Sequence, residues 1–172
     1  MPPDETPEPP ETRLHTIGHS DHSTEAFTDL LRHYTVSVLV DVRSQPYSRW
    51  TPQFNREKLA RDLTSAGIRY VFMGDSLGGR PADRTWYEAD GKRLDYERVA
   101  LTPAFRAGID GLLKLAATAC VVVMCSEGDH EQCHRNALIT PELLRRGARV
   151  VHILPDGGTV EAHLEPRQLN MF

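Results

Sequence analysis

The sequence contains no long hydrophobic run, and this absence excludes one class of protein at once. None of its apolar stretches approaches the roughly 20 residues that a membrane-spanning helix needs. The first twelve residues hold five prolines and four acidic side chains but no apolar segment, so they do not read as a signal peptide. We therefore expect a protein of the cytoplasm, without a membrane partner.

Cysteine is also scarce. The chain has 3 cysteines, an odd number that argues against a disulfide framework and for reduced thiols. Basic residues also do not outnumber acidic ones. Residues 1–12 carry a charge of −4, and the remaining chain holds 20 basic and 20 acidic side chains. Binding driven by bulk positive charge is therefore excluded, and any contact with nucleic acid has to be local.

The composition predicts one globular domain after a short tail. Hydrophobic residues make up 40% and charged residues 26% of the chain, a balance typical of folded proteins. No hydrophobic periodicity occurs before Leu14, so we interpret residues 1–12 as a disordered, acidic, proline-rich tail and residues 13–172 as a single domain.

Short apolar runs alternate with amphipathic stretches in the rest of the chain. Strands are expected at 14–17, 36–42, 70–73, 120–124 and 150–154, and helices after Ser23 and at about 55–66, 103–117 and 133–146. Thr140-Pro141 has the form of an N-cap followed by a first-turn proline, so the last helix could instead be two short ones. This alternation predicts an α/β fold: a mostly parallel sheet of about five strands with helices on both faces, a Rossmann-like three-layer sandwich.

In such a sheet, ligands bind beyond the carboxyl ends of the strands. Many residues suited to binding or chemistry lie at or after the ends of the expected strands and would meet at that edge: His19, Asp41, Arg43, Gly79, Arg80, Cys125, Glu127, Cys133, His134 and Arg135. A folding requirement alone does not predict so many reactive groups in one place.

Two of these strand ends allow more than one interpretation. Asp41 lies within an apolar run and must be paired, and Arg43 points to the same side of an extended chain. Their ion pair would either close the strand end or position a substrate. The following loop, 44–50, combines the aromatic residues Tyr47 and Trp50 with Arg49, and it could stack a base or simply pack over the sheet. Gly79 and Arg80 would let a phosphate approach the backbone closely.

The segment from Cys125 to Arg135 is the most informative part of the chain. A metal site is disfavoured because no CxxC pair is present and the adjacent Cys133 and His134 cannot easily reach one tetrahedral ion. A redox pair of Cys125 and Cys133 remains open, although the thioredoxin-type spacing is absent.

A third interpretation of the segment is an anion pocket with an activated thiol, in which backbone N–H groups and the Arg135 fork hold phosphate. A fourth is two small buried residues whose neighbouring arginine caps local carbonyl groups. We assign Cys120, at the start of a buried strand, to packing. No metal and no cofactor are expected.

These motifs resemble a known bacterial family, the one catalogued as domain of unknown function 488. The resemblance rests on Thr16–Ser20, Val40–Ser44, Tyr70, Leu77–Arg80 and the stretch from Cys125 and Glu127 to Cys133-His134-Arg135, and it covers about residues 13–165. It implies a compact α/β fold with a pocket lined by these motifs, Tyr70 included. It implies no particular reaction.

The sequence therefore favours an enzyme acting on an anionic, phosphate-bearing substrate, such as a nucleotide or a nucleic-acid end. Arg43, Arg80 and Arg135 would hold the anion, and Cys125 or Cys133 would be the nucleophile of a transferase or hydrolase. Protons would be handled by Asp41, Glu127 or His134. The alternatives are a binding module without chemistry for a nucleotide or nucleic acid, and a Cys125/Cys133 redox protein.

Overall fold

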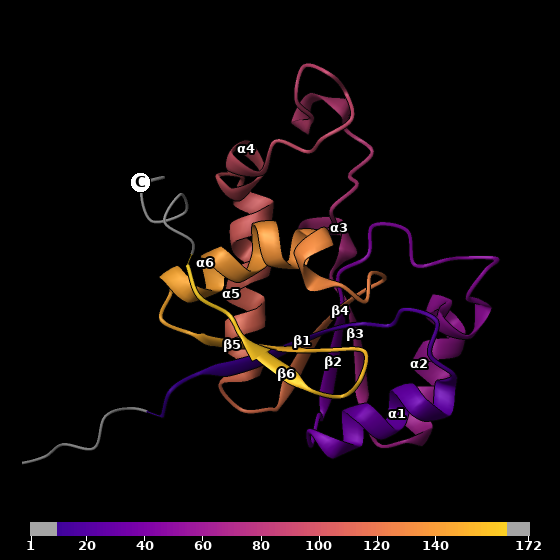
Figure 1. Cartoon of the computed structure of the whole chain (residues 1–172). Helices are drawn as coiled ribbons and strands as arrows, with labels where there is room; N and C mark the ends of the chain where they lie inside the picture. Colours follow the sequence, from indigo (N-terminus) through magenta and orange to yellow (C-terminus); the bar gives the residue numbers. More distant parts are fainter. Residues whose placement is uncertain (1–9, 165–172) are drawn as a thin grey trace, which may run out of the picture.

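The computed structural model describes residues 10–164, which fold around a single six-stranded sheet (Figure 1). The strands are β1 (Arg13–Gly18), β2 (Val38–Asp41), β3 (Arg69–Phe72), β4 (Val121–Cys125), β5 (Arg149–Ile153) and β6 (Thr159–Glu161). Their spatial order is β3-β2-β4-β1-β5-β6, and every pairing is parallel except that of β5 with β6. The predicted parallel sheet of five strands is confirmed, with one antiparallel strand added.

The central strands are buried on both faces, which explains their unbroken apolar sequences. Every residue of β2 and β4 is buried. Consecutive residues pack on opposite faces of the sheet, because side chains alternate along a strand. Leu39 and Val122 belong to one core cluster, whereas Val40 and Val123 belong to the other.

Helices cover the two faces, as predicted for a three-layer fold. In Figure 1, α1 (Thr24–His33) and α2 (Arg56–Ser65) lie on one side, and α5 (Pro103–Ala116) and α6 (Thr140–Arg145) on the other. The expected cap of α1 is present, since the hydroxyl of Ser23 accepts a hydrogen bond of 3.1 Å from the backbone N–H of Ala26.

The segment around Pro141 differs in detail from the predicted one. A π-helical turn (Arg135–Ile139) runs directly into α6, so Thr140 lies inside the helix and Ile139 is its N-cap. Pro141 has no N–H to donate within the helix, and a wider turn is one way to absorb that loss. The Thr140 hydroxyl donates a 2.6 Å hydrogen bond to the Arg135 carbonyl, which satisfies that group.

The long connection after β3 is more ordered than a loop. It contains α3 (Gly74–Leu77), a 3₁₀ turn (Arg84–Trp86) and α4 (Tyr96–Ala100), and it rises above the carboxyl edge of the sheet in Figure 1. Two other short 3₁₀ turns occur, at Pro52–Phe54 and His130–Gln132. Leu94 and Val99 are buried in the core and hold the connection against α5.

The last strand was not predicted, because all three of its residues are exposed and it lacks an apolar pattern. Of the predicted tail, residues 1–9 lie outside the described residues; the carbonyl of Thr12 accepts a hydrogen bond of 2.8 Å from the N–H of Arg149. Within residues 10–164, no helix has the length and apolar character required to cross a bilayer.

Candidate active site

A cleft of about 1290 Å³ opens at the carboxyl edge of the sheet, where the strand-end residues were expected to meet. Its walls come from the loop after β2, the connection 79–97 and the segment after β4. Seven of the predicted site residues line it: Arg43, Gly79, Arg80, Cys125, Glu127, Cys133 and His134. The other five, which are His19, Asp41, Arg49, Tyr70 and Arg135, lie outside this lining.

The end of β1 packs closely against the segment that begins at Cys125. The backbone N–H of His19 donates a hydrogen bond of 3.0 Å to the carbonyl of Cys125. Gly18 has no side chain, and this matters here, because a Cβ at its position would lie 1.6 Å from the carbonyl oxygen of Glu127.

The two buried cysteines of this segment are in direct contact. Their Sγ atoms lie 2.7 Å apart, at the two ends of the loop 126–132. Cys133 Sγ also accepts from the backbone N–H of Arg135 at 3.5 Å and lies 3.7 Å from His134 Nδ1. Cys125 Sγ instead faces an acceptor, the carbonyl oxygen of Glu127, at 3.8 Å.

These surroundings shift the pKa values of the two thiols in opposite directions. The hydrogen bond from Cys125, together with His134 and the Arg135 N–H, lowers the pKa of Cys133 to about 6. Burial, and then the neighbouring Cys133, raises the pKa of Cys125 well above its ordinary value. Of the two cysteines, Cys133 is therefore the one that ionises first as the pH rises.

Glu127 completes a cluster of three donor atoms that a metal ion could use. One carboxylate oxygen of Glu127 and the two sulfurs lie within 4.8 Å of one another. Two thiolates around zinc sit about 3.7 Å apart, since each Zn–S bond is about 2.3 Å. The sulfurs here are closer than that, so their arrangement favours direct thiol contact over a shared ion. Burial opposes ionisation of Glu127, but its own backbone N–H, the neighbouring cysteines and His134 outweigh that effect and lower its pKa.

Arg135 packs against the loop 126–132 and does not line the cleft. Its side chain is fully buried, and Nη2 donates to the carbonyl oxygens of Glu127 at 3.1 Å and Gly128 at 3.2 Å. Nε and Nη1 have no partner among residues 10–164. Of the roles considered for this arginine, its geometry matches the capping of loop carbonyls.

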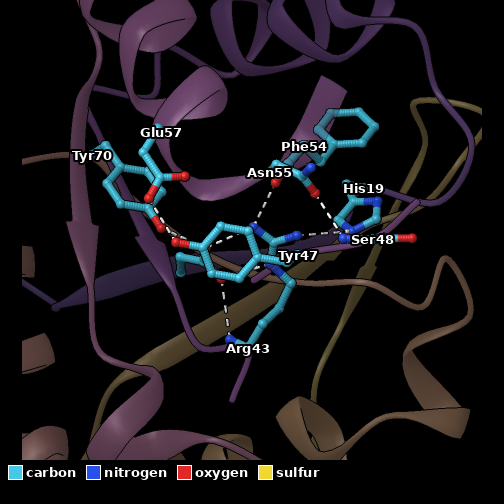
Figure 2. A network of polar contacts seen from close by, with 9 residues as sticks. His19, Arg43, Tyr47, Ser48, Phe54, Asn55, Glu57 and Tyr70 are labelled. Carbon is cyan, nitrogen blue, oxygen red and sulfur yellow. Dashed lines mark hydrogen bonds and ion pairs between the residues drawn. The ribbon is translucent and has the colours of Figure 1, made fainter. Parts of the chain in front are cut away.

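Asp41 and Arg43 form the ion pair that their spacing indicates, and the pair is the centre of a buried network. Figure 2 labels its members Arg43, Tyr70 and His19. The fully buried Asp41 carboxylate accepts from Arg43 Nε at 2.9 Å, from Arg43 Nη2 at 2.8 Å and from the Tyr70 hydroxyl at 2.6 Å. Burial and the Asp41 carboxylate raise the pKa of Tyr70, so this phenol stays a donor. Arg43 Nη2 also donates to the carbonyl of Phe54 at 2.8 Å.

His19 joins the same network from β1. Its ring stacks on Phe54 at 4.4 Å, and its Nε2 lies 3.4 Å from Arg43 Nη1. Burial lowers the pKa of His19 to about 4, so the ring is neutral and can accept from Arg43. Four of the five donor hydrogens of Arg43 are thereby used, and the guanidinium is held rigidly at the cleft wall.

The loop after β2 exposes two aromatic side chains, one of which lines the cleft. Trp50 is 79% exposed, and the Arg49 guanidinium lies 4.6 Å from the centre of its ring. Tyr47 is 57% exposed, lines the cleft and donates a hydrogen bond of 2.6 Å to Glu57, as Figure 2 shows. The interpretation of this loop as a stacking surface is therefore compatible with its exposure.

One wall of the cleft was missed by the sequence analysis. Residues of the connection after β3 line it and include Arg84, Tyr87, Glu88, Lys92, Arg93, Asp95, Tyr96 and Glu97. No motif marks them, because charged and aromatic residues in an irregular segment carry no periodicity. The density of charge in this stretch was the only available signal.

Comparison with known proteins identifies the family and nothing further. A family model described as "Domain of unknown function DUF488" matches residues 23–140, well over half of the chain. The chain therefore belongs to this family, in agreement with the resemblance of its motifs. Neither the curated proteins nor the solved structures contain a match.

Proposed function

We propose that this member of the DUF488 family is a cysteine-dependent enzyme, a transferase or hydrolase, that acts on an anionic substrate with Cys133 as its nucleophile. The observation that carries the proposal is the state of Cys133 in the cleft. It contacts a thiol donor at 2.7 Å and a histidine nitrogen at 3.7 Å, and its pKa is lowered to about 6. A thiolate at neutral pH is the reactive form of cysteine.

The neighbouring groups supply the proton chemistry. Cys125 stabilises the thiolate by donating to it. His134 lies next to Cys133 with its Nε2 buried and unpartnered among the described residues, so it can carry a proton to or from a substrate atom. Glu127 lines the same wall and is the second candidate for this role. Asp41 is fully occupied by Arg43 and Tyr70, and its role is to position Arg43.

The preference for an anion rests on the cations of the cleft. Arg43, Arg80, Arg84, Lys92 and Arg93 line it. Four acidic side chains, Glu88, Asp95, Glu97 and Glu127, share the same walls. Binding therefore depends on local contacts, which fits a phosphate-bearing molecule of mixed polarity such as a nucleotide or a nucleic-acid end better than a simple polyanion.

The pH dependence of alkylation tests the nucleophile. Reduced protein is treated with iodoacetate from pH 5 to pH 9, and the modified cysteine is located by peptide mass mapping. Cys133 should react with a midpoint at about pH 6. The Cys120→Ser variant should behave like the wild type, whereas Cys133→Ser should lose the low-pH reaction. A Cys133 that reacts only above pH 8 would contradict the proposal.

Inorganic phosphate tests the anionic substrate. Phosphate should slow alkylation of Cys133 by iodoacetamide, a neutral reagent, and raise the melting temperature. Arg80→Ala removes an exposed cation of the cleft and should weaken both effects, whereas Arg61→Ala, an exposed arginine of α2, should leave them unchanged. Equal responses in the two variants would contradict binding of phosphate in the cleft.

A binding module for nucleic acid is the second candidate, favoured by the exposed Trp50 with Arg49 over its ring. Base stacking on such a residue is worth roughly 1–3 kcal/mol per base. A single-stranded oligonucleotide should quench the fluorescence of Trp50, and Trp50→Phe identifies that signal against the other tryptophan, Trp86. If Cys133→Ala binds the oligonucleotide normally and Cys133 shows no low-pH reactivity, this candidate replaces the enzyme.

A further inference from the structure

The contact between Cys125 and Cys133 is closer than the packing of two small side chains requires. The Sγ atoms lie 2.7 Å apart, and a disulfide bond is about 2.05 Å long. The sulfurs would have to approach by only about 0.7 Å to bond. The loop that joins them, 126–132, is held at Glu127 and Gly128 by Arg135, whereas Ser126, Asp129, Glu131 and Gln132 are exposed.

The surroundings of the two sulfurs assign them different roles. Cys133 Sγ lies next to an N–H donor, that of Arg135, and a ring nitrogen of His134. Cys125 Sγ faces a carbonyl oxygen, which favours a protonated thiol. Both line the cleft, so a small oxidant that enters it meets the sulfur of Cys133 with the thiol of Cys125 in contact with it. Redox-sensitive cysteines have this arrangement, a low-pKa thiolate beside a resolving thiol.

We infer that Cys133 is an oxidation site for hydroperoxides and that Cys125 resolves the product as a Cys125–Cys133 disulfide. In the first step the Cys133 thiolate attacks the OH oxygen of the hydroperoxide, the O–O bond breaks, and hydroxide (from hydrogen peroxide) or alkoxide (from an organic hydroperoxide) leaves; Cys133 becomes a sulfenic acid. In the second step the sulfur of Cys125 attacks that of Cys133, the S–O bond breaks, and water leaves with the proton of the Cys125 thiol. The pair loses two electrons and the peroxide gains them.

This inference rests on the reactivity of Cys133, which the proposed function also uses, but it needs no substrate. Formation of the disulfide would consume the nucleophile and stop the proposed reaction until a dithiol restores both thiols. The enzyme would then be switched off reversibly instead of being oxidised further to an irreversible sulfinic acid.

The test is titration of the reduced full chain with hydrogen peroxide, followed by mass spectrometry of the intact protein and its peptides. We expect the wild type to lose two hydrogens, with Cys125 and Cys133 in one linked peptide pair, and dithiothreitol to reverse the change. In Cys125→Ser, a sulfenic acid at Cys133 should persist and be captured by dimedone. In Cys133→Ser the oxidation should slow at least about tenfold. Cys120→Ser, with its cysteine outside the cleft, is the matched control and should oxidise like the wild type.

Three outcomes overturn the inference: accumulation of Cys133 sulfinic acid in the wild type without a disulfide, oxidation of Cys133→Ser at the wild-type rate, or zinc bound stoichiometrically by the two thiols in the reduced protein. Peptide mapping of the wild type decides the matter even if a variant fails to fold. Rapid alkylation of Cys133 at low pH without any disulfide would overturn the oxidation site alone and leave the proposed nucleophile in place.

Discussion

The guanidinium of Arg135 donates a hydrogen bond of 3.1 Å from Nη2 to the carbonyl oxygen of Glu127, and the same nitrogen reaches the carbonyl of Gly128 at 3.2 Å. A single side chain thus holds the loop that carries the two contacting thiols. Arg135 is fully buried and does not line the cleft, so its charge acts on the loop.

The first prediction concerns this arginine. Arg135→Ala leaves two loop carbonyls without their donor, so it should lower the free energy of unfolding by about 1–3 kcal/mol. Arg135→Lys keeps a donor but loses the planar fork, and we expect a smaller loss. Urea denaturation measures both. Arg80→Ala, at an exposed position, is the control and should change stability by no more than about 0.5 kcal/mol. A stable Arg135→Ala variant that no longer responds to phosphate would instead show that Arg135 contributes to anion binding.

The second prediction concerns the buried carboxylate of β2. Asp41→Asn leaves the Arg43 guanidinium buried without its counter-charge, which should cost about 3–5 kcal/mol. Tyr70→Phe removes one hydrogen bond to that carboxylate and should cost roughly 1–3 kcal/mol. Tyr47→Phe provides a matched control, because Tyr47 donates to the carboxylate of Glu57 at the same 2.6 Å distance but is exposed. Equal effects of the two tyrosine variants in urea denaturation would show that burial of the network contributes little.

The third prediction is a loss of stability at acid pH. Burial lowers the pKa of His19 to about 4 and that of His152 to about 3, from 6.5. Below pH 6.5 these two histidines are therefore protonated in the unfolded chain but remain neutral in the folded chain. The free energy of unfolding should fall as pH decreases from 6.5 towards these folded pKa values, by up to about 1.4 kcal/mol per pH unit for each histidine.

A histidine variant separates this effect from the titration of carboxylates in the same range. His152→Gln removes one of these groups and should flatten the pH dependence between pH 6 and pH 4, whereas His33→Gln, at an exposed position of α1, should leave it unchanged. Identical slopes in urea denaturation of the wild type and His152→Gln would contradict the burial of a neutral His152.

The fourth prediction links a glycine to the reactivity of the thiolate. A Cβ at Gly79 would lie 2.6 Å from Cγ of the His134 ring, so Gly79→Ala should displace this ring from Cys133. His134 lowers the pKa of Cys133, and the alkylation midpoint should therefore move upward in the variant. Gly111→Ala is the control. It meets only the terminal methyl of Met73, at 3.3 Å, and should leave the midpoint unchanged and the helix no less stable. A wild-type midpoint in Gly79→Ala would show that His134 does not tune the thiol.

The sequence by itself determined the sheet and the identity of the residues at its carboxyl edge. Continuous apolar runs such as that of β4 indicate strands buried on both faces, and a parallel connection brings their ends to one side. The spacing of Asp41 and Arg43 was enough to indicate their ion pair, because alternate residues of an extended chain share a face. The exposed β6 has no such pattern, and it forms only because β5 offers it an edge.

Only the tertiary structure decided which of these residues reach the cleft. Cys125 and Cys133 are separated by a loop without periodicity, and their contact at 2.7 Å depends on the close approach of that loop to Gly18 and on the support of Arg135. In the structure the side chain of Arg135, which was expected to bind the substrate, is buried and donates to the carbonyls of this loop. Side-chain direction at a loop end is set by packing between distant segments, and local sequence does not encode it.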